Sequence, residues 1–162
     1  MEKIKLTLEF EVYEPDGELP ESDHQLLKMA AEAAEKAYAP YSLYKVGAAV
    51  RLQSGTIITG NNQENVAYPS GLCAERVALF YASANYPGDN PVAIAIRAKA
   101  VSFEVNDPVT PCGACRQVMM EAENQNEHKI RVLMQGEDGK IFVSRSVENL
   151  LPISFRADGL KK

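Results

Sequence analysis

The segment Val92-Ala93-Ile94-Ala95-Ile96-Arg97-Ala98-Lys99 settles the fold class of this chain. Its apolar residues occupy almost consecutive positions, which is typical of a β-strand that other elements cover on both faces. Segments with helical patterns lie on either side of it in the chain, at 73–85 and 112–124. A buried strand that alternates with helices predicts a sheet with helices packed on its faces.

Four other short segments share the strand pattern and extend this sheet. The first two form a hairpin, because Ser54-Gly55 between them is a turn sequence. The five predicted strands cover 46–52, 56–60, 92–99, 130–134 and 140–143. We therefore expect an α/β fold, a three-layer α/β/α sandwich around a mixed, mainly five-stranded sheet.

Two further helices are expected near the ends of this region. Ser22 or Asp23 provides an N-cap for a helix that runs to Ala39. The alanines along its apolar stripe indicate a close approach to a neighbouring element. Ser146 is expected to cap a short last helix before Pro152.

The N-terminal residues carry a pattern of their own. Apolar and polar residues alternate from Ile4 to Val12, which predicts an extra strand with one wet face, and Glu14-Pro15-Asp16-Gly17 ends it as a turn. This strand either lengthens the sheet or covers an interface, and the pattern does not choose between them. The predicted divisions are a strand-like extension at 1–20, one folded domain at 21–156 and a polar tail at 157–162.

Composition excludes several classes of partner. The chain has 162 residues, a net charge of −5 and a pI of about 5.1, so it has no general attraction to nucleic acid. It shows no apolar run of the ~18 residues that a membrane span needs and no signal-peptide pattern at its start. We expect a small-molecule partner, no nucleic-acid or membrane partner, and a cytoplasmic location.

The chain has three cysteines, and their spacing predicts a metal site. Cys112 and Cys115 are separated by two residues, and Cys73 stands alone upstream. Three thiolates bind zinc and leave its fourth position open, which is the arrangement of a catalytic site. A structural zinc clip would need His24 or His128 as a fourth ligand, and a redox dithiol would leave Cys73 unexplained.

Two residues beside Cys73 have roles that this metal would require. Glu75, in the first turn of the predicted helix, can reach back over the zinc as a general acid and base. Three thiolates make zinc electron-rich and its water less acidic, so some group must withdraw charge from sulfur. We assign that charge tuning to Arg76, which faces Cys73 across one helical turn.

Cys73-Ala74-Glu75-Arg76 together with Pro111-Cys112-Gly113-Ala114-Cys115-Arg116-Gln117 resembles the cytidine deaminases, in the small form whose zinc has three Cys ligands. The resemblance runs from Ala37 to Phe155. It includes Ala39-Pro40-Tyr41-Ser42, Val46-Gly47-Ala48-Ala49, the segment 60–65 and Leu150-Leu151-Pro152.

The resemblance implies hydrolytic deamination of cytidine and deoxycytidine to uridine and deoxyuridine with release of ammonia, a reaction of pyrimidine salvage. It implies one Zn²⁺ per chain, held by Cys73, Cys112 and Cys115. Hydroxide on zinc attacks C4 of the base, and Glu75 shuttles protons to N3 and to the departing amine. It also makes 21–156 the catalytic domain.

The resemblance further implies how the substrate is held. Asn62 and Glu64 match the ribose-binding pair, and the backbone N–H of Ala74 meets the base carbonyl. Tyr44 takes the place of the usual Phe that stacks on the base. Phe155 matches the aromatic residue that reaches a neighbour's pocket, so the resemblance implies a homotetramer with shared active sites.

Three hypotheses about the function remain open. The first is a free-nucleoside deaminase; the second is a deaminase of another small pyrimidine-like substrate. The third is a zinc-stabilised scaffold without catalysis, and Glu75 beside an incomplete ligand set argues against it. Editing of RNA or DNA is disfavoured by the acidic net charge and by Glu64, which would repel a phosphate.

Overall fold

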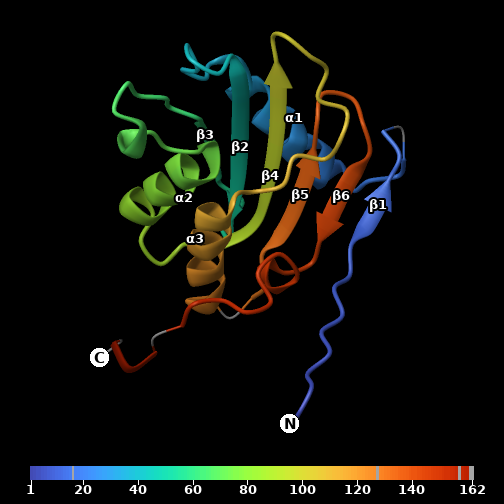
Figure 1. Cartoon of the computed structure of the whole chain (residues 1–162), viewed down its shortest axis with the longest axis vertical. Helices are drawn as coiled ribbons and strands as arrows, with labels where there is room; N and C mark the ends of the chain where they lie inside the picture. Colours follow the sequence, from blue (N-terminus) through green and yellow to red (C-terminus); the bar gives the residue numbers. More distant parts are fainter. Residues whose placement is uncertain (16, 127, 157, 161–162) are drawn as a thin grey trace.

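The computed structural model describes residues 1–15, 17–126, 128–156 and 158–160 and contains one six-stranded mixed sheet (Figure 1). The strand order is β1-β6-β5-β4-β2-β3, and only β4 and β5 run parallel. The elements are β1 (Glu11–Tyr13), α1 (Glu21–Glu35), β2 (Tyr44–Leu52), β3 (Ile57–Asn61), α2 (Ala74–Asn85), β4 (Pro91–Ala100), α3 (Gly113–Asn124), β5 (Arg131–Gln135) and β6 (Ile141–Ser144). Short 3-10 turns cover Tyr68–Ser70, Val147–Asn149 and Asp158–Leu160.

Helices cover both faces of the sheet, as the sequence predicts. Figure 1 shows α1 behind the sheet and α2 and α3 in front of it. The alternate residues of β4 divide between the two sides: Ala95 packs in the core with α1, whereas Ile94 and Ile96 pack in the core with α2 and α3. The predicted three-layer α/β/α sandwich is therefore confirmed.

Glycine allows both α1 and α2 to lie close to the sheet. A Cβ atom at Gly47 of β2 would lie 2.0 Å from the carbonyl oxygen of Ala30 in α1. A Cβ atom at Gly60 of β3 would lie 2.6 Å from the backbone nitrogen of Ala78 in α2. Real Cβ atoms do not approach backbone so closely, so these glycines and the alanines of the helices fix the spacing between layers.

The predicted N-terminal extra strand is present and lengthens the sheet, but it is much shorter than the predicted range from Ile4 to Val12. Only Glu11–Tyr13 joins the sheet, antiparallel to Ile141–Val143, and residues 1–10 form no strand. The reason is that β6 ends at Ser144, so the preceding residues have no neighbouring strand to pair with. The predicted turn is present as a hydrogen bond from the Gly17 N–H to the Glu14 carbonyl at 2.9 Å, while Asp16 lies outside the described residues.

The predictions for the first helix need two corrections. Pro20 occupies the N-cap position of α1, and no side chain caps the helix. Asp23 is instead buried, with its carboxylate 2.8 Å from Nε of Arg131 and 3.4 Å from Nη2 of Arg51. The helix also ends at Glu35 and not at Ala39.

The early end of α1 follows from a competing backbone interaction. Tyr38 forms an isolated parallel bridge with Gln63, and its N–H donates to the Asn62 carbonyl at 3.1 Å. The chain leaves the helix to make these bonds.

The C-terminal part of the domain agrees better with prediction. The hydroxyl of Ser146 accepts from the Glu148 N–H at 3.1 Å, so the predicted cap is confirmed, although the helix is a 3-10 turn. Of the predicted tail, residues 157, 161 and 162 lie outside the described residues. In the described ranges, no helix has the length and apolar character needed to cross a membrane.

Candidate active site

Two helix N-termini bring the three cysteines together. Cys73 is the N-cap residue of α2, Cys112 is the N-cap residue of α3, and Cys115 lies in the first turn of α3. The Cys73 carbonyl accepts from the Val77 N–H at 3.1 Å, and the Cys112 carbonyl accepts from the Arg116 N–H at 2.9 Å, so backbone groups begin both helices. Neither N-cap cysteine uses its sulfur to cap its own helix, which leaves the sulfurs free for a metal.

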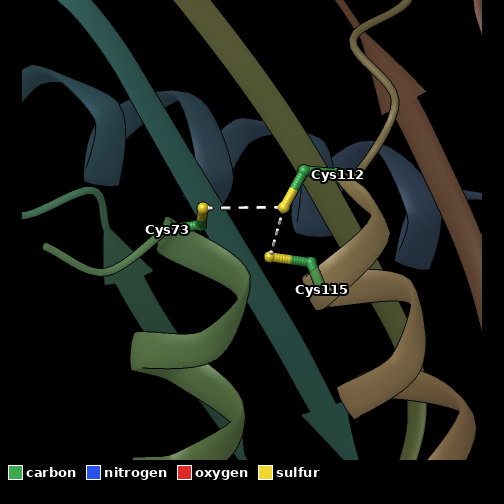
Figure 2. Close-up of side chains that lie close together, drawn as sticks. All are labelled: Cys73, Cys112 and Cys115. Carbon is green, nitrogen blue, oxygen red and sulfur yellow. Dashed lines mark hydrogen bonds between the residues drawn. The ribbon is translucent and has the colours of Figure 1, made fainter. Parts of the chain in front are cut away.

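The three sulfur atoms point toward one another (Figure 2). Sγ of Cys112 lies 3.8 Å from Sγ of Cys73 and 3.5 Å from Sγ of Cys115, and all three lie within 4.8 Å of one another. Zn–S bonds of about 2.3 Å in a tetrahedron place sulfurs about 3.8 Å apart. The sulfurs therefore fit one zinc ion.

This group contains three ligands and no fourth. Among the described residues it is the only cluster of three or more Cys, His, Asp or Glu side chains with metal-binding spacing, and it includes neither His24 nor His128. The described part of the chain thus provides no histidine for a closed structural site, and a fourth position is left to solvent or substrate.

Arg76 lies where charge tuning would require it. Its Nη2 atom is 3.7 Å from Sγ of Cys73. The pKa of Cys73 is lowered to about 5, chiefly by a hydrogen bond from the Cys115 thiol, with further contributions from Arg76 and Cys112. The same hydrogen bond and burial raise the pKa of Cys115.

Glu75 is a buried acid in the first turn of α2. Only 4% of its surface is exposed, and burial raises the pKa of its carboxyl group. A hydrogen bond from the Glu75 backbone, and to a lesser extent the neighbouring Cys115, opposes part of the increase. A carboxyl group that holds its proton to higher pH than usual, beside a metal-binding sulfur, is suited to proton transfer near neutral pH.

An open cavity of about 920 Å³ lies in front of the sulfurs. Its volume is in the range of small-molecule sites, and its wall combines apolar surface with a few polar groups. The predicted residues Tyr44, Asn62, Glu64, Cys73, Glu75, Arg76 and Cys112 all line it, together with Tyr41, Ser42, Val46, Gln63, Asn65, Tyr68, Gly71, Leu72, Val109 and Thr110.

Asn62 and Glu64 reach the cavity from the segment just after β3, and hydrogen bonds hold both side chains. The amide of Asn62 accepts from the Val46 N–H at 2.8 Å and donates to the Tyr44 carbonyl at 2.9 Å, so β2 fixes its orientation. Glu64 is half-buried and accepts from the Tyr41 N–H at 2.8 Å and from the Ser42 hydroxyl. The Ser42 hydroxyl, foremost among several donors, lowers the pKa of Glu64, which keeps this carboxylate charged at neutral pH.

The structure brings Tyr44 to the cavity but leaves Ala74, between the lining residues Cys73 and Glu75, and Phe155 off its wall. The ring of Tyr44 stacks on Phe103 with centroids 6.1 Å apart. Ala74 is buried at the first position of α2, where a backbone N–H has no partner within the helix. Phe155 does not line the cavity; its ring is exposed, and Gln117 holds its backbone N–H and carbonyl at 3.1 and 3.0 Å.

Sequence reasoning missed one contribution to the site. Phe103 supports Tyr44 from a long loop, where no periodic pattern could have revealed it. Arg116, which is expected to bridge helix and loop, has that structural role: it donates to the carbonyls of Pro111 at 2.8 Å and Leu150 at 3.0 Å. Its long side chain thus ties the segment before Cys112 to the C-terminal part of the domain.

Known proteins resemble this chain over most of its length. The family described as "Cytidine and deoxycytidylate deaminase zinc-binding region" matches residues 20–128. The curated protein named cytidine deaminase from Halalkalibacterium halodurans is 42% identical over 135 residues, which cover 83% of this chain and 95% of that protein. The one from Mycobacterium tuberculosis is 34% identical over 148 residues, covering 89% and 98%.

Solved structures agree with the sequence comparisons. The crystal structure of cytidine deaminase from Burkholderia pseudomallei has a TM-score of 0.70 and 43% identity, and the match covers 82% of this chain and 98% of that chain. The structure of cytidine deaminase from Mycobacterium tuberculosis has a TM-score of 0.64 and 31% identity, covering 83% and 97%. Both the fold and the zinc-binding segment are therefore shared, and the chain belongs to the cytidine and deoxycytidylate deaminase family.

Proposed function

We propose that this chain catalyses the hydrolytic deamination of cytidine and deoxycytidine to uridine and deoxyuridine, with release of ammonia. The observation that carries the proposal is the three-sulfur cluster with buried Glu75 beside it, at the wall of a cavity large enough to admit a nucleoside. The similar proteins named cytidine deaminase support the choice of substrate. We also propose that the protein acts in the cytoplasm, because that compartment keeps its three thiols reduced. The reaction would there belong to pyrimidine salvage.

The roles of the residues follow from their positions. Zinc held by Cys73, Cys112 and Cys115 would supply a Lewis acid that makes water nucleophilic at neutral pH. Glu75 removes a proton from the attacking water and delivers it to N3 of the base, then takes the remaining proton from the new C4 hydroxyl group and passes it to the amine at C4. A C4–O bond forms, the C4–N bond breaks, and ammonia leaves.

The cavity wall would hold the nucleoside in a fixed orientation. Asn62 and Glu64 present an amide and a carboxylate, which suit the neutral hydroxyl groups of a sugar. Tyr44, supported by Phe103, offers an aromatic face to the base. We assign the contact with the base carbonyl to the backbone N–H of Ala74, at the first position of α2, where helix geometry gives an N–H no partner within the helix.

Ammonia release across a panel of compounds tests this function. We expect rapid release from cytidine and deoxycytidine, slow release from cytidine monophosphate and none from adenosine. Release from another pyrimidine analogue in preference to cytidine would replace the substrate assignment. No release from any compound by zinc-loaded protein would favour the scaffold reading.

Glu64→Gln is expected to weaken the preference of the enzyme for cytidine over cytidine monophosphate. The charged carboxylate repels a 5′-phosphate, so its removal should raise kcat/KM for cytidine monophosphate relative to cytidine by about tenfold. Steady-state kinetics with both substrates measures the ratio. Glu32→Gln, an exposed acid on α1 across the sheet, is the control and should leave the ratio unchanged. An unchanged ratio in Glu64→Gln would remove Glu64 from substrate selection.

Arg76→Gln is expected to keep zinc and to move the pH–rate profile upward by about one unit. Without the guanidinium 3.7 Å from Cys73, the sulfur donates more charge to the metal. Kinetics between acidic and alkaline pH, with zinc content measured on each sample, checks the shift. Arg76→Lys keeps the charge and should restore most of the profile. Identical profiles in all three proteins would exclude Arg76 from charge tuning.

We further propose a homotetramer in which Phe155 completes a neighbour's site. Its ring is exposed and lies outside the cavity of its own chain, so it is available to a second subunit. Phe155→Ala should lower kcat/KM by about tenfold. Co-refolding this variant with inactive Glu75→Gln should recover about a quarter of wild-type activity, because random mixing restores that share of composite sites. Absence of recovery would assign Phe155 to its own chain.

A further inference from the structure

Residues 2–12 form an extended segment that lacks a partner strand over most of its length. Figure 1 shows it leaving the sheet at β1, with the N-terminus away from the body of the domain. Residues 1–10 are exposed, and the exposed fractions of Ile4, Leu6 and Leu8 are 84%, 51% and 48%. Exposed apolar residues at every second position are unusual for a segment that stays single.

Among the described residues, two contacts hold the end of this segment nearest β1. The ring of Phe10 lies 6.4 Å from that of Phe142, and the Glu9 N–H donates to Oδ1 of Asn149 at 3.5 Å. In the described part of the chain, no strand pairs with residues 1–10. The backbone groups before Glu9 are therefore open to another chain.

The two sides of this segment differ in character. Val12 lies opposite Phe142 in the β1–β6 register, and Phe142 packs against the core on the α2 and α3 side of the sheet. Since side chains alternate, the even-numbered apolar residues continue that side. The odd-numbered side carries charge, beginning with Glu11, which pairs with Arg131 at 3.3 Å and with Arg145.

The order of these charges makes the segment complementary to itself. In an antiparallel pair of two identical copies centred on Thr7, Lys5 lies opposite Glu9 and Lys3 lies opposite Glu11. On the other side, Leu6 lies opposite Leu8 and Ile4 opposite Phe10. A register shifted by two residues keeps only one of the two kinds of Lys–Glu pair, and a register shifted by one places apolar residues against charged ones.

We propose that residues 2–12 of two copies of this chain pair antiparallel about a two-fold axis at Thr7. The pairing joins the β1 edges of two sheets into one continuous sheet. It brings the exposed apolar side chains of the two copies side by side, which reduces their exposure, and it removes an open sheet edge. It is independent of the proposed function, because β1 and the cavity-lining strands β2 and β3 lie at opposite ends of the sheet order.

Disulfide trapping tests the pairing and its register. Opposed residues of an antiparallel pair have Cα atoms about 4.5–5.5 Å apart, which a disulfide can span. Thr7→Cys should therefore give a covalent dimer on a non-reducing gel under mild oxidation. Lys3→Cys is the matched control, because its two copies would lie about 27 Å apart. Wild-type protein, with zinc content measured, controls for the three native cysteines.

Charge reversal supplies the second arm. In the Thr7→Cys background, Lys5→Glu replaces the two Lys5–Glu9 pairs with two repulsive Glu–Glu pairs. The rate of disulfide trapping should therefore fall roughly tenfold at low salt. Adding Glu9→Lys should restore the rate. Equal trapping of Thr7→Cys and Lys3→Cys, no trapping of either, or no restoration by Glu9→Lys would each overturn the proposal. Unchanged zinc content and thermal unfolding would show that the variants are folded.

Discussion

Glu75→Gln is expected to retain one zinc per chain and to lower kcat for cytidine deamination by about 10²–10⁴-fold. The substitution keeps the size of a side chain that is 4% exposed, so the packing of α2 should be preserved. It removes the only group beside the sulfurs that we assign to proton transfer. Because burial raises the pKa of Glu75, the wild-type carboxyl group exchanges protons closer to neutral pH than an exposed glutamate does.

Three measurements on one preparation separate this loss from misfolding. Zinc content and thermal unfolding should match those of the wild type, whereas ammonia release should fall. The exposed Glu32→Gln provides the control for a general effect of charge and should keep full activity. Wild-type turnover by zinc-loaded Glu75→Gln would show that the proton is carried by another group.

Cys115→Ser is expected to weaken zinc binding by about 10²–10³-fold. This loss is the share of one ligand in a total zinc-binding free energy of about 10–16 kcal/mol. A serine hydroxyl does not ionise near neutral pH, and Cys115 is fully buried, so no other donor can move in easily. Deamination should be lost with the metal. The melting temperature should also fall in the presence of zinc, because the variant loses the stabilisation that bound ion provides.

Wild-type protein stripped with a chelator is the matched control for this variant. It should resemble Cys115→Ser in activity and melting temperature, and added zinc should restore only the wild type. If Cys115→Ser retained stoichiometric zinc after dialysis against a weak chelator, Cys115 would not be a ligand.

The sequence predicted correctly the elements whose apolar pattern shows which face is buried and whose ends are marked by nearby residues. The apolar run in β4 corresponds to a strand with helices on both faces, and the cysteines at the starts of α2 and α3 are flanked by helix patterns. The hairpin of β2 and β3 has its turn at Gly55, whose φ of +91° favours glycine. In these cases the residues that define the element lie within it.

Predictions failed where the deciding partner lies far away in the chain. The alternation of apolar and polar residues from Ile4 to Val12 indicates a strand, but it does not show whether a neighbouring strand is available for pairing. β6 ends too early to pair with most of this segment. Asp23 looked like a cap, yet its partner Arg131 is 108 residues away. Glu123 is likewise buried, because it accepts from the N–H groups of Ile130 at 2.8 Å and Val147 at 3.0 Å.

The candidate site shows the same division. The metal-binding residues form two short motifs, so the sequence located them. The stacking of Phe103 on Tyr44 and the hold of Gln117 on the backbone of Phe155 depend on loop paths that no local pattern encodes.

We infer that a zinc ion held by three sulfurs enables this cavity to deaminate a nucleoside. The rate of ammonia release from cytidine, measured while chelator-stripped protein is titrated with zinc, tests this inference. We expect the rate to rise in proportion to bound zinc and to stop rising at one ion per chain. A rate that is independent of zinc, or no ammonia at full occupancy, would show that zinc is not the catalytic ion.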